Sequence, residues 1–157
     1  MSELGYNFYM VVCDKQGKVA NENDEISLEQ HFQGMRYSKV EGLNKIGKPK
    51  NIYSEKYADS DRLRVHVPDE IMNEATSVTF TFFFVGDDRQ RTYHNFLDYV
   101  RKGFHRYHDD ARNKYLYFCV NSELKPAEEM LYGSVPYLKF DLEVQNIFGR
   151  TFDSPIV

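Results

Sequence analysis

Alternating apolar and polar positions dominate two stretches of the chain, residues 76–85 and 135–148. In the first stretch the apolar positions on one face are Val78, Phe80, Phe82 and Phe84. In the second, the same spacing is kept by Leu138, Phe140, Leu142, Val144 and Phe148. Because successive side chains of a strand point to opposite faces, each stretch predicts a β-strand with one buried face. The opposite face of the second stretch is polar and is expected to be wet or covered by a partner.

Shorter strands are predicted where β-branched and aromatic residues cluster between turn-forming residues. They cover residues 6–12, 35–41, 62–67 and 114–120. Residues 15–33 are polar, and although Ser27 and Gln30 could form the capping box of one helical turn, we expect a loop there. The segment after residue 120, which contains Pro126, is also expected to be a polar loop.

The period of the pattern changes once, between the two long strands. Tyr93, Phe96, Leu97 and Val100 follow helical spacing and Gly103 supplies a natural stop, which predicts a helix at about residues 92–102. Several strands without alternating βαβ units predict a mainly β (α+β) protein. The expected architecture is an antiparallel β-sandwich or split barrel with one flanking α-helix.

Length and composition narrow the class further. A chain of 157 residues is expected to form a single domain, residues 1–157, with a core that needs neither disulfide nor metal. The chain has 12 Tyr and 12 Phe, which is far from a disordered composition. It has two cysteines, Cys13 and Cys119, without CxxC spacing, and we expect both to be reduced.

The net charge of the chain indicates which kinds of partner it can bind. With 20 basic and 24 acidic side chains the net charge is −4, so there is no excess of cations to bind nucleic acid or an anionic membrane surface. No apolar run is long enough to span a membrane, and the N-terminus has no signal-peptide pattern. The two ends are acidic and the middle is mildly basic. These features favour protein partners.

One cluster could hold a metal ion. His105, His108 and Asp109 are ligand types that zinc or iron would use. On a strand, however, His105 and His108 point to opposite faces, and no matching HxxxH or CxxC motif occurs elsewhere. We therefore expect solvated polar positions at the end of a strand, and no metal or cofactor.

No motif for catalysis is present. The chain lacks the GxSxG, GxxxxGK[ST] and GxGxxG patterns. Cys13 and Cys119 are expected to be small buried apolar residues. Acidic pairs occur at residues 87–88, 109–110 and 128–129, but adjacent carboxylates diverge in an extended chain, so they are expected in turns and on the surface. We expect a protein that is not an enzyme.

The order of segments resembles a known family. The segments are RLRVHVP (62–68), VTFTFFFVG (78–86), YHNFLDYVRKG (93–103), YHDDARNK (107–114), YLYFCV (115–120), KP (125–126) and NIFGRTF (146–152). Over roughly residues 50–152 this order resembles small tail proteins of bacteriophages and prophages. It is most similar to the β-rich N-terminal ring domain of distal tail proteins.

The resemblance implies a non-enzymatic structural subunit of a virion tail, made in the bacterial cytoplasm. It implies a ring-like homo-oligomer, a hexamer in that family, whose partners are copies of itself and other tail proteins. Distal tail proteins usually add a second, carbohydrate-module-like domain that a chain of this length cannot hold. A one-domain version, or a neighbouring tube or terminator protein, is therefore expected.

Two uses of the surface remain open. The polar face of the last strand supplies the interface candidates Lys139, Asp141, Glu143 and Gln145. The alternative is a β-sandwich binding module for a small or extended ligand, with a cleft lined by exposed tyrosines. The candidates for that cleft are Tyr107, Tyr115 and Tyr137.

Overall fold

The computed structural model describes residues 8–48, 73–120 and 123–156 in full, and residues 53–56 and 63–66 as backbone only. The strands are β1 (Phe8–Cys13), β2 (Ile26–Ser27), β3 (Met35–Glu41), β4 (Tyr53–Lys56), β5 (Leu63–His66), β6 (Thr76–Val85), β7 (Phe104–Asp109), β8 (Lys114–Cys119), β9 (Glu128–Tyr132) and β10 (Val135–Asn146). The helices are α1 (Leu28–His31) and α2 (Arg89–Val100), with a 3-10 turn at Glu22–Asp24. The outermost residues of the strands predicted at 6–12 and 62–67 lie outside the described residues.

One antiparallel sheet contains eight of these strands. Its order is β2-β1-β7-β8-β10-β6-β3, with β9 paired to β10, while β4 and β5 pair with each other in a separate two-stranded sheet. The longest ladder joins β10 to β6, from Tyr137 opposite Val85 to Asn146 opposite Thr76. The mainly β class with a flanking helix, predicted from the alternation, is confirmed.

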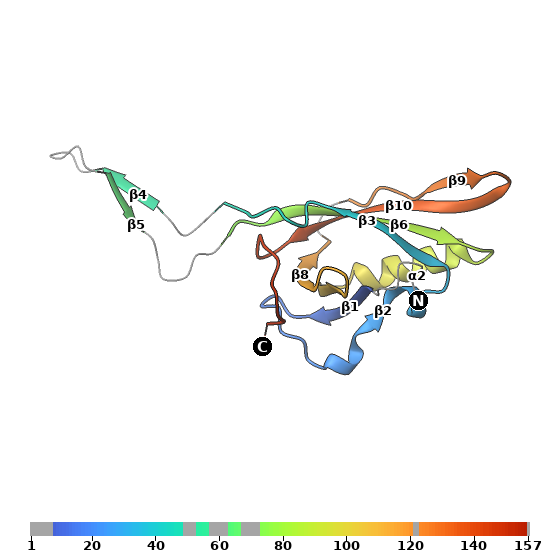
Figure 1. Cartoon of the computed structure of the whole chain (residues 1–157), viewed down its shortest axis with the longest axis horizontal. Coiled ribbons are helices and arrows are strands. Elements are labelled where there is room, and N and C mark those ends of the chain that lie inside the picture. The colour runs from blue at the N-terminus through green and yellow to red at the C-terminus, as the bar shows by residue number, and fades with distance from the viewer. Residues whose placement is uncertain (1–7, 49–52, 57–62, 67–72, 121–122, 157) are drawn as a thin grey trace.

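The sheet folds over on itself (Figure 1). β10 is joined to β8 only at Gln145 and Asn146, so the two halves of the sheet share a narrow hinge. Across the interior, the rings of Phe80 and Tyr107 are 4.9 Å apart, although β6 and β7 are separated by two strands in the sheet. Near the two ends of the sheet, the rings of Phe8 and Tyr37 stack at 3.7 Å. The result is a split barrel that is closed by side chains.

The helix α2 packs against the inner face of the β3–β6–β10 half. Phe96 is fully buried and lies 5.2 Å from Phe82 and 5.5 Å from Phe32, measured between ring centroids. The helix begins at Arg89, earlier than the predicted residue 92, because Gly86 at φ +94° completes the turn after β6. At the other end, Gly103 adopts φ +71°, as expected for a residue that stops a helix.

The predicted core positions are buried. All four inward residues of β6 and the inward residues of β10 from Leu138 to Val144 are at most 2% exposed. Phe148 is different, because β10 ends at Asn146 and Phe148 lies in the tail beyond it. There it packs with Tyr117 and Phe152 in an aromatic cluster whose ring centroids are 5.6–5.7 Å apart.

Two predicted loops contain regular structure. Within residues 15–33 the structure has a 3-10 turn, β2 and α1, which Leu28 and Phe32 anchor in the core at 1% and 7% exposure. The segment after Pro126 forms β9, which pairs with β10 from Glu128 to Tyr132. Within the described residues, no helix is both long enough and apolar enough to cross a membrane.

Candidate interaction surface

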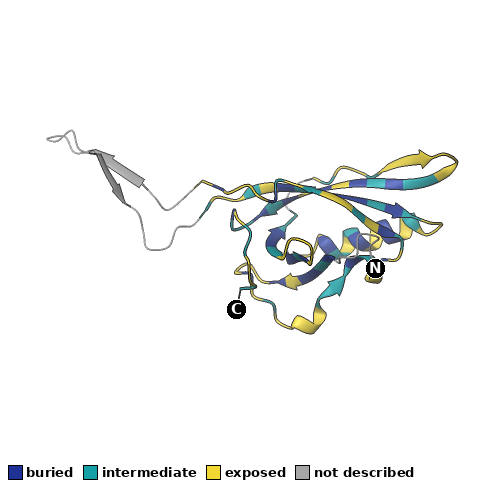
Figure 2. Cartoon of the chain, in the orientation of Figure 1, coloured by how far each residue is buried: buried dark blue, intermediate teal, exposed yellow. Residues whose placement is uncertain are grey.

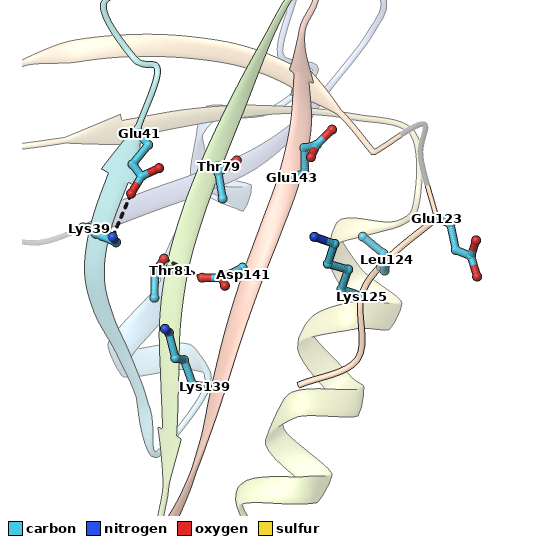
Figure 3. A pocket seen from close by; sticks show the side chains of 10 residues that line it. All are labelled: Lys39, Glu41, Thr79, Thr81, Glu123, Leu124, Lys125, Lys139, Asp141 and Glu143. Atoms are coloured by element: carbon cyan, nitrogen blue, oxygen red, sulfur yellow. Dashed lines mark hydrogen bonds and ion pairs between the residues drawn. The ribbon is translucent and has the colours of Figure 1, made fainter. Parts of the chain in front are cut away.

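The outward face of the β3–β6–β10 half holds three of the four interface candidates. Lys139, Asp141 and Glu143 point away from the core and line a shallow groove of about 230 Å³ (Figure 3). The other groove residues are Lys39, Glu41, Thr79, Thr81, Glu123, Leu124 and Lys125. Gln145 lies beyond the groove, half-buried, where its Oε1 is 3.9 Å from the thiol of Cys119.

Three cross-strand rows make up this outer face. In order along β6 they are Glu41–Thr79–Glu143, Lys39–Thr81–Asp141 and Arg36–Phe83–Lys139. The first row carries two acids, the second one base and one acid, and the third two bases. The fixed charge of the face therefore changes from negative to positive along the strands.

Two polar contacts involve side chains of the middle row, one within the row and one to Glu41 of the first row. The Thr81 hydroxyl donates to Asp141 Oδ1 at 2.7 Å, and Thr81 is only 2% exposed although it points outward. Lys39 Nζ lies 2.7 Å from Glu41 Oε1, and this contact raises the pKa of Lys39. Both of those side chains are more than half exposed, so the ion pair contributes little to stability and leaves the charges available to a partner.

The side wall of the groove is formed by the segment that leads into β9. Figure 3 shows Lys125 extending from this segment toward β10. β10 pairs with β9 over residues 135–139 and with β8 at residues 145–146, so residues 140–144 have no strand partner on this side among the described residues. Charged side chains and an open strand edge are features of a surface that recognises another protein.

His105 was expected to be solvated, and this is wrong. It is fully buried, with its ring 5.0 Å from the ring of Tyr99 and 5.7 Å from that of Phe118. Burial lowers the pKa of His105 to about 4, although backbone groups at the end of α2 partly oppose this shift. His105 is therefore a neutral core residue at neutral pH.

Asp109 was expected on the surface, and this is also wrong. It is fully buried, and its carboxylate accepts hydrogen bonds from the Tyr107 hydroxyl at 2.9 Å and from the Arg112 backbone N–H at 2.6 Å. Arg112 Nη1 also donates to Asp109 Oδ2 at 2.9 Å. Asp109 thus fixes the turn between β7 and β8. Its neighbour Asp110 is exposed, as predicted.

The structure does not bring the metal candidates together. His105 faces the core, whereas His108 lies on the other face of β7, where it stacks on Tyr115 at 4.3 Å. Within residues 8–48, 73–120 and 123–156, no three His, Cys, Asp or Glu side chains form a group suited to a metal ion.

The predicted tyrosine cleft is not formed. Tyr107 is fully buried, so its expected exposure is wrong. Tyr115 is half-buried under His108, and Tyr137 packs edge-on against Phe83 with the ring centroids 5.5 Å apart. The three tyrosines belong to β7, β8 and β10. None of them lines any of the three depressions found among the described residues.

The cysteines have the environment of structural thiols. Cys13 is buried, as predicted, and its burial is the main reason why its pKa rises to about 11. Cys119 is half-buried rather than buried, and burial raises its pKa as well. Raised thiol pKa values disfavour the thiolate, which is the nucleophilic form.

Two features of the structure are not predicted from the sequence. Arg106 is 2% exposed and binds Glu22 and Glu25 at 2.6 and 2.8 Å, which fastens the loop before β2 onto β7. No local pattern signals this long-range contact. The hairpin of β9 and β10, in contrast, has a signal in its Gly133-Ser134 turn between two apolar segments.

The chain shows little similarity to known proteins. No protein-family model matches the chain, and no curated protein matches it. Among solved structures, the chain is similar to the Dit protein (gp 19.1) of SPP1, described as a paradigm of the hub adsorption apparatus in phages that infect Gram-positive bacteria. The identity is 14% and the TM-score 0.45, over 88% of this chain and 49% of that one. The chain therefore spans about half the length of this neighbour, and a likeness of this degree carries no argument about function.

Proposed function

We propose that this chain is a non-enzymatic structural subunit of a phage-like tail, in which copies assemble into a ring of the distal tail, tube or terminator type. The observation that carries the proposal is the graded charge of the outer face. A face with acids at one end and bases at the other can meet a second copy displaced along the strands, with the acidic row on the basic row. Such contacts between unlike surfaces generate rings when the rotation closes.

The build of this face supports the proposal. Its charged side chains project from regular strands whose opposite faces are core residues, so the spacing of the backbone positions that carry them is set before a partner arrives. Complementary charges at this spacing would set the register in which a partner binds.

The segment order supports the choice of a tail protein. Three of the segments that resemble tail proteins coincide with regular elements: VTFTFFFVG with β6, YHNFLDYVRKG with α2 and YLYFCV with β8, while NIFGRTF begins at the last residue of β10. The order of a strand, a helix and a strand in these segments is the order of β6, α2 and β8 in the fold, in which β7 lies between α2 and β8.

Self-association is tested by sedimentation velocity over a wide range of concentrations. The parent chain is expected to form one defined oligomer that dissociates on dilution. Glu143→Lys, which places a base in the acidic row, is expected to weaken the oligomer. Asp98→Lys makes the same change on an exposed position of α2 and is expected to leave it intact.

Two results would contradict the proposal. A chain that stays monomeric at every concentration has no self-interface. Equal dissociation of the Glu143→Lys and Asp98→Lys oligomers would show that the outer face is not part of the interface. Tape-measure or tail-fibre genes beside the coding gene would independently support the tail assignment, and unrelated neighbours would weaken it.

A further inference from the structure

The tip of the β9–β10 hairpin is apolar and exposed. Of the six large apolar side chains exposed within the described residues, four belong to this hairpin. They are Met130, Leu131, Tyr132 and Val135, with exposures of 36, 69, 82 and 59%. Exposed apolar side chains gathered in one place, rather than scattered, mark an interaction site.

Nothing in the described structure covers this tip. The ladder between β10 and β6 ends at Tyr137 opposite Val85, so β10 continues to Val135 with only β9 beside it. Every residue of β9 is exposed. Figure 2 shows the hairpin reaching past the buried part of the sheet.

A second apolar feature lies at the end of β1. Val12, Cys13, Val19 and Ala20 line a shallow depression of about 330 Å³, with Asp14 and Lys18 at its rim. Val12 is 49% exposed and, among the residues that the structure describes, is one of the two exposed large apolar residues outside the hairpin. The wall of the depression is a fixed turn, because Asp14 Oδ1 accepts backbone N–H groups of Gln16 and Lys18 at 2.8 and 2.9 Å.

The tip and the depression lie at opposite ends of the body. In Figure 1 the β9 tip is at the right end, whereas β1 points toward the left, where its last residue meets the depression. The tip of one copy cannot reach its own depression. It can reach that of a second copy displaced along the long axis of the molecule.

The charges of the outer face agree with this displacement. Lys139 and Arg36 form the basic row on the side of the tip, because β10 runs from Val135 at the tip toward Asn146. Glu143 and Glu41 form the acidic row toward the opposite end. A copy displaced head to tail brings the basic end of one subunit toward the acidic end of the next.

We infer that the β9–β10 tip docks into the depression at the end of β1 on a second copy of this chain. Tyr132 and Val135, which pair across the hairpin and share one of its faces, supply the apolar contact, and they pack against Val12 and Val19. This inference rests on the proposed function for the existence of self-association, and it adds which two surfaces meet. The contact joins unlike surfaces, so an open chain of copies keeps one free tip at one end and one free depression at the other until the ring closes.

The first test is the dissociation of the oligomer, followed by sedimentation velocity. The double variant Tyr132→Ser and Val135→Ser is expected to dissociate at a concentration about tenfold higher than the parent, since it removes both apolar side chains that enter the depression. Val12→Ser is expected to act in the same direction from the receiving side. Ile46→Ser is the matched control, because Ile46 is 74% exposed outside both surfaces.

The second test is cross-linking of the assembled chain. A variant with Tyr132→Cys, Val12→Cys, Cys13→Ala and Cys119→Ala carries one thiol in each surface. With a short bis-maleimide it is expected to give covalent ladders whose peptides join position 132 of one chain to position 12 of the next.

The outcomes separate this inference from the proposed function. If an oligomer forms but the tip variants behave like Ile46→Ser, or position 132 joins only to position 132, the docking is wrong and self-assembly stands. If the parent never associates, both are wrong.

Discussion

Tyr107 donates a hydrogen bond of 2.9 Å to Asp109, two residues along the same strand, and both side chains are fully buried. Alternation along β7 puts them on one face, with Asp109 at the point where the chain turns toward β8. Arg112, which is 41% exposed in its side chain, brings the compensating charge from the turn. A buried carboxylate thus joins the core to the turn.

Removing this carboxylate is expected to be costly. Asp109→Ala leaves the Tyr107 hydroxyl buried without its acceptor and frees the turn, and the loss of a buried charge partner typically costs about 3–5 kcal/mol of unfolding free energy. Asp110→Ala, at the exposed neighbour, is expected to cost less than about 0.5 kcal/mol. Urea denaturation at neutral pH measures both. Similar small losses would show that the network does not stabilise the fold.

The two faces of β10 are expected to respond differently to truncation. Phe140 is fully buried between Phe82 and Tyr93, so Phe140→Ala is expected to cost about 3–5 kcal/mol through lost apolar burial and a cavity. Glu143→Ala removes an exposed side chain and is expected to change the monomer by less than about 0.5 kcal/mol. Chemical denaturation at concentrations where the chain is monomeric distinguishes the two, and equal effects would contradict the assignment of faces.

His105 is expected to make the fold sensitive to acid. Its pKa is about 4 in the folded chain against an ordinary value of 6.5, so the folded state favours the neutral ring. The stability from this group is present above pH 6.5 and is lost as the pH falls toward 4, by about 3 kcal/mol in total.

The pH dependence of unfolding tests this directly. His105→Phe keeps an aromatic ring in the site and is expected to lose less stability than the parent between pH 7 and pH 4.5. His94→Phe, at an exposed position of α2, is expected to keep the dependence of the parent. Identical curves for the parent and His105→Phe would contradict the buried neutral histidine.

Arg106 is expected to hold the loop before β2 in place. Burial would lower its pKa, but the hydrogen bonds and charges of Glu22 and Glu25 outweigh this and hold the guanidinium protonated. Replacing both acids, Glu22→Gln with Glu25→Gln, leaves a buried cation without a counter-charge. Faster hydrogen exchange of residues 14–25 is expected, while exchange in β6 stays slow. Unchanged exchange in this loop would show that the ion pairs do not fasten it.

The long strands β6 and β10 could be predicted because each has one face in the core and one outer face. Apolar residues therefore alternate with more polar ones along the sequence. β7 could not be predicted in this way. Its inner face meets the core and its outer face is covered by the loop that carries Glu22, so the polar residues His105, Arg106 and Asp109 are buried. The polar pattern of β7 therefore predicts solvated side chains at positions that the structure buries.

The candidate surface was predictable only in part. The outward direction of Lys139, Asp141 and Glu143 follows from the strand period. The rows that give the face its charge gradient depend on the register of β3 and β6 against β10, which no local pattern contains. All residues of β9 are exposed and no apolar alternation marks the strand, so the Gly133-Ser134 turn is its sequence signal.

Copies of this chain are expected to close into a ring through their own surfaces, and electron microscopy of the purified parent chain can show such rings. Closed rings of one uniform diameter are expected, and they are expected to disappear in the Tyr132→Ser and Val135→Ser double variant. Single particles of monomer size under conditions of high protein concentration would contradict it.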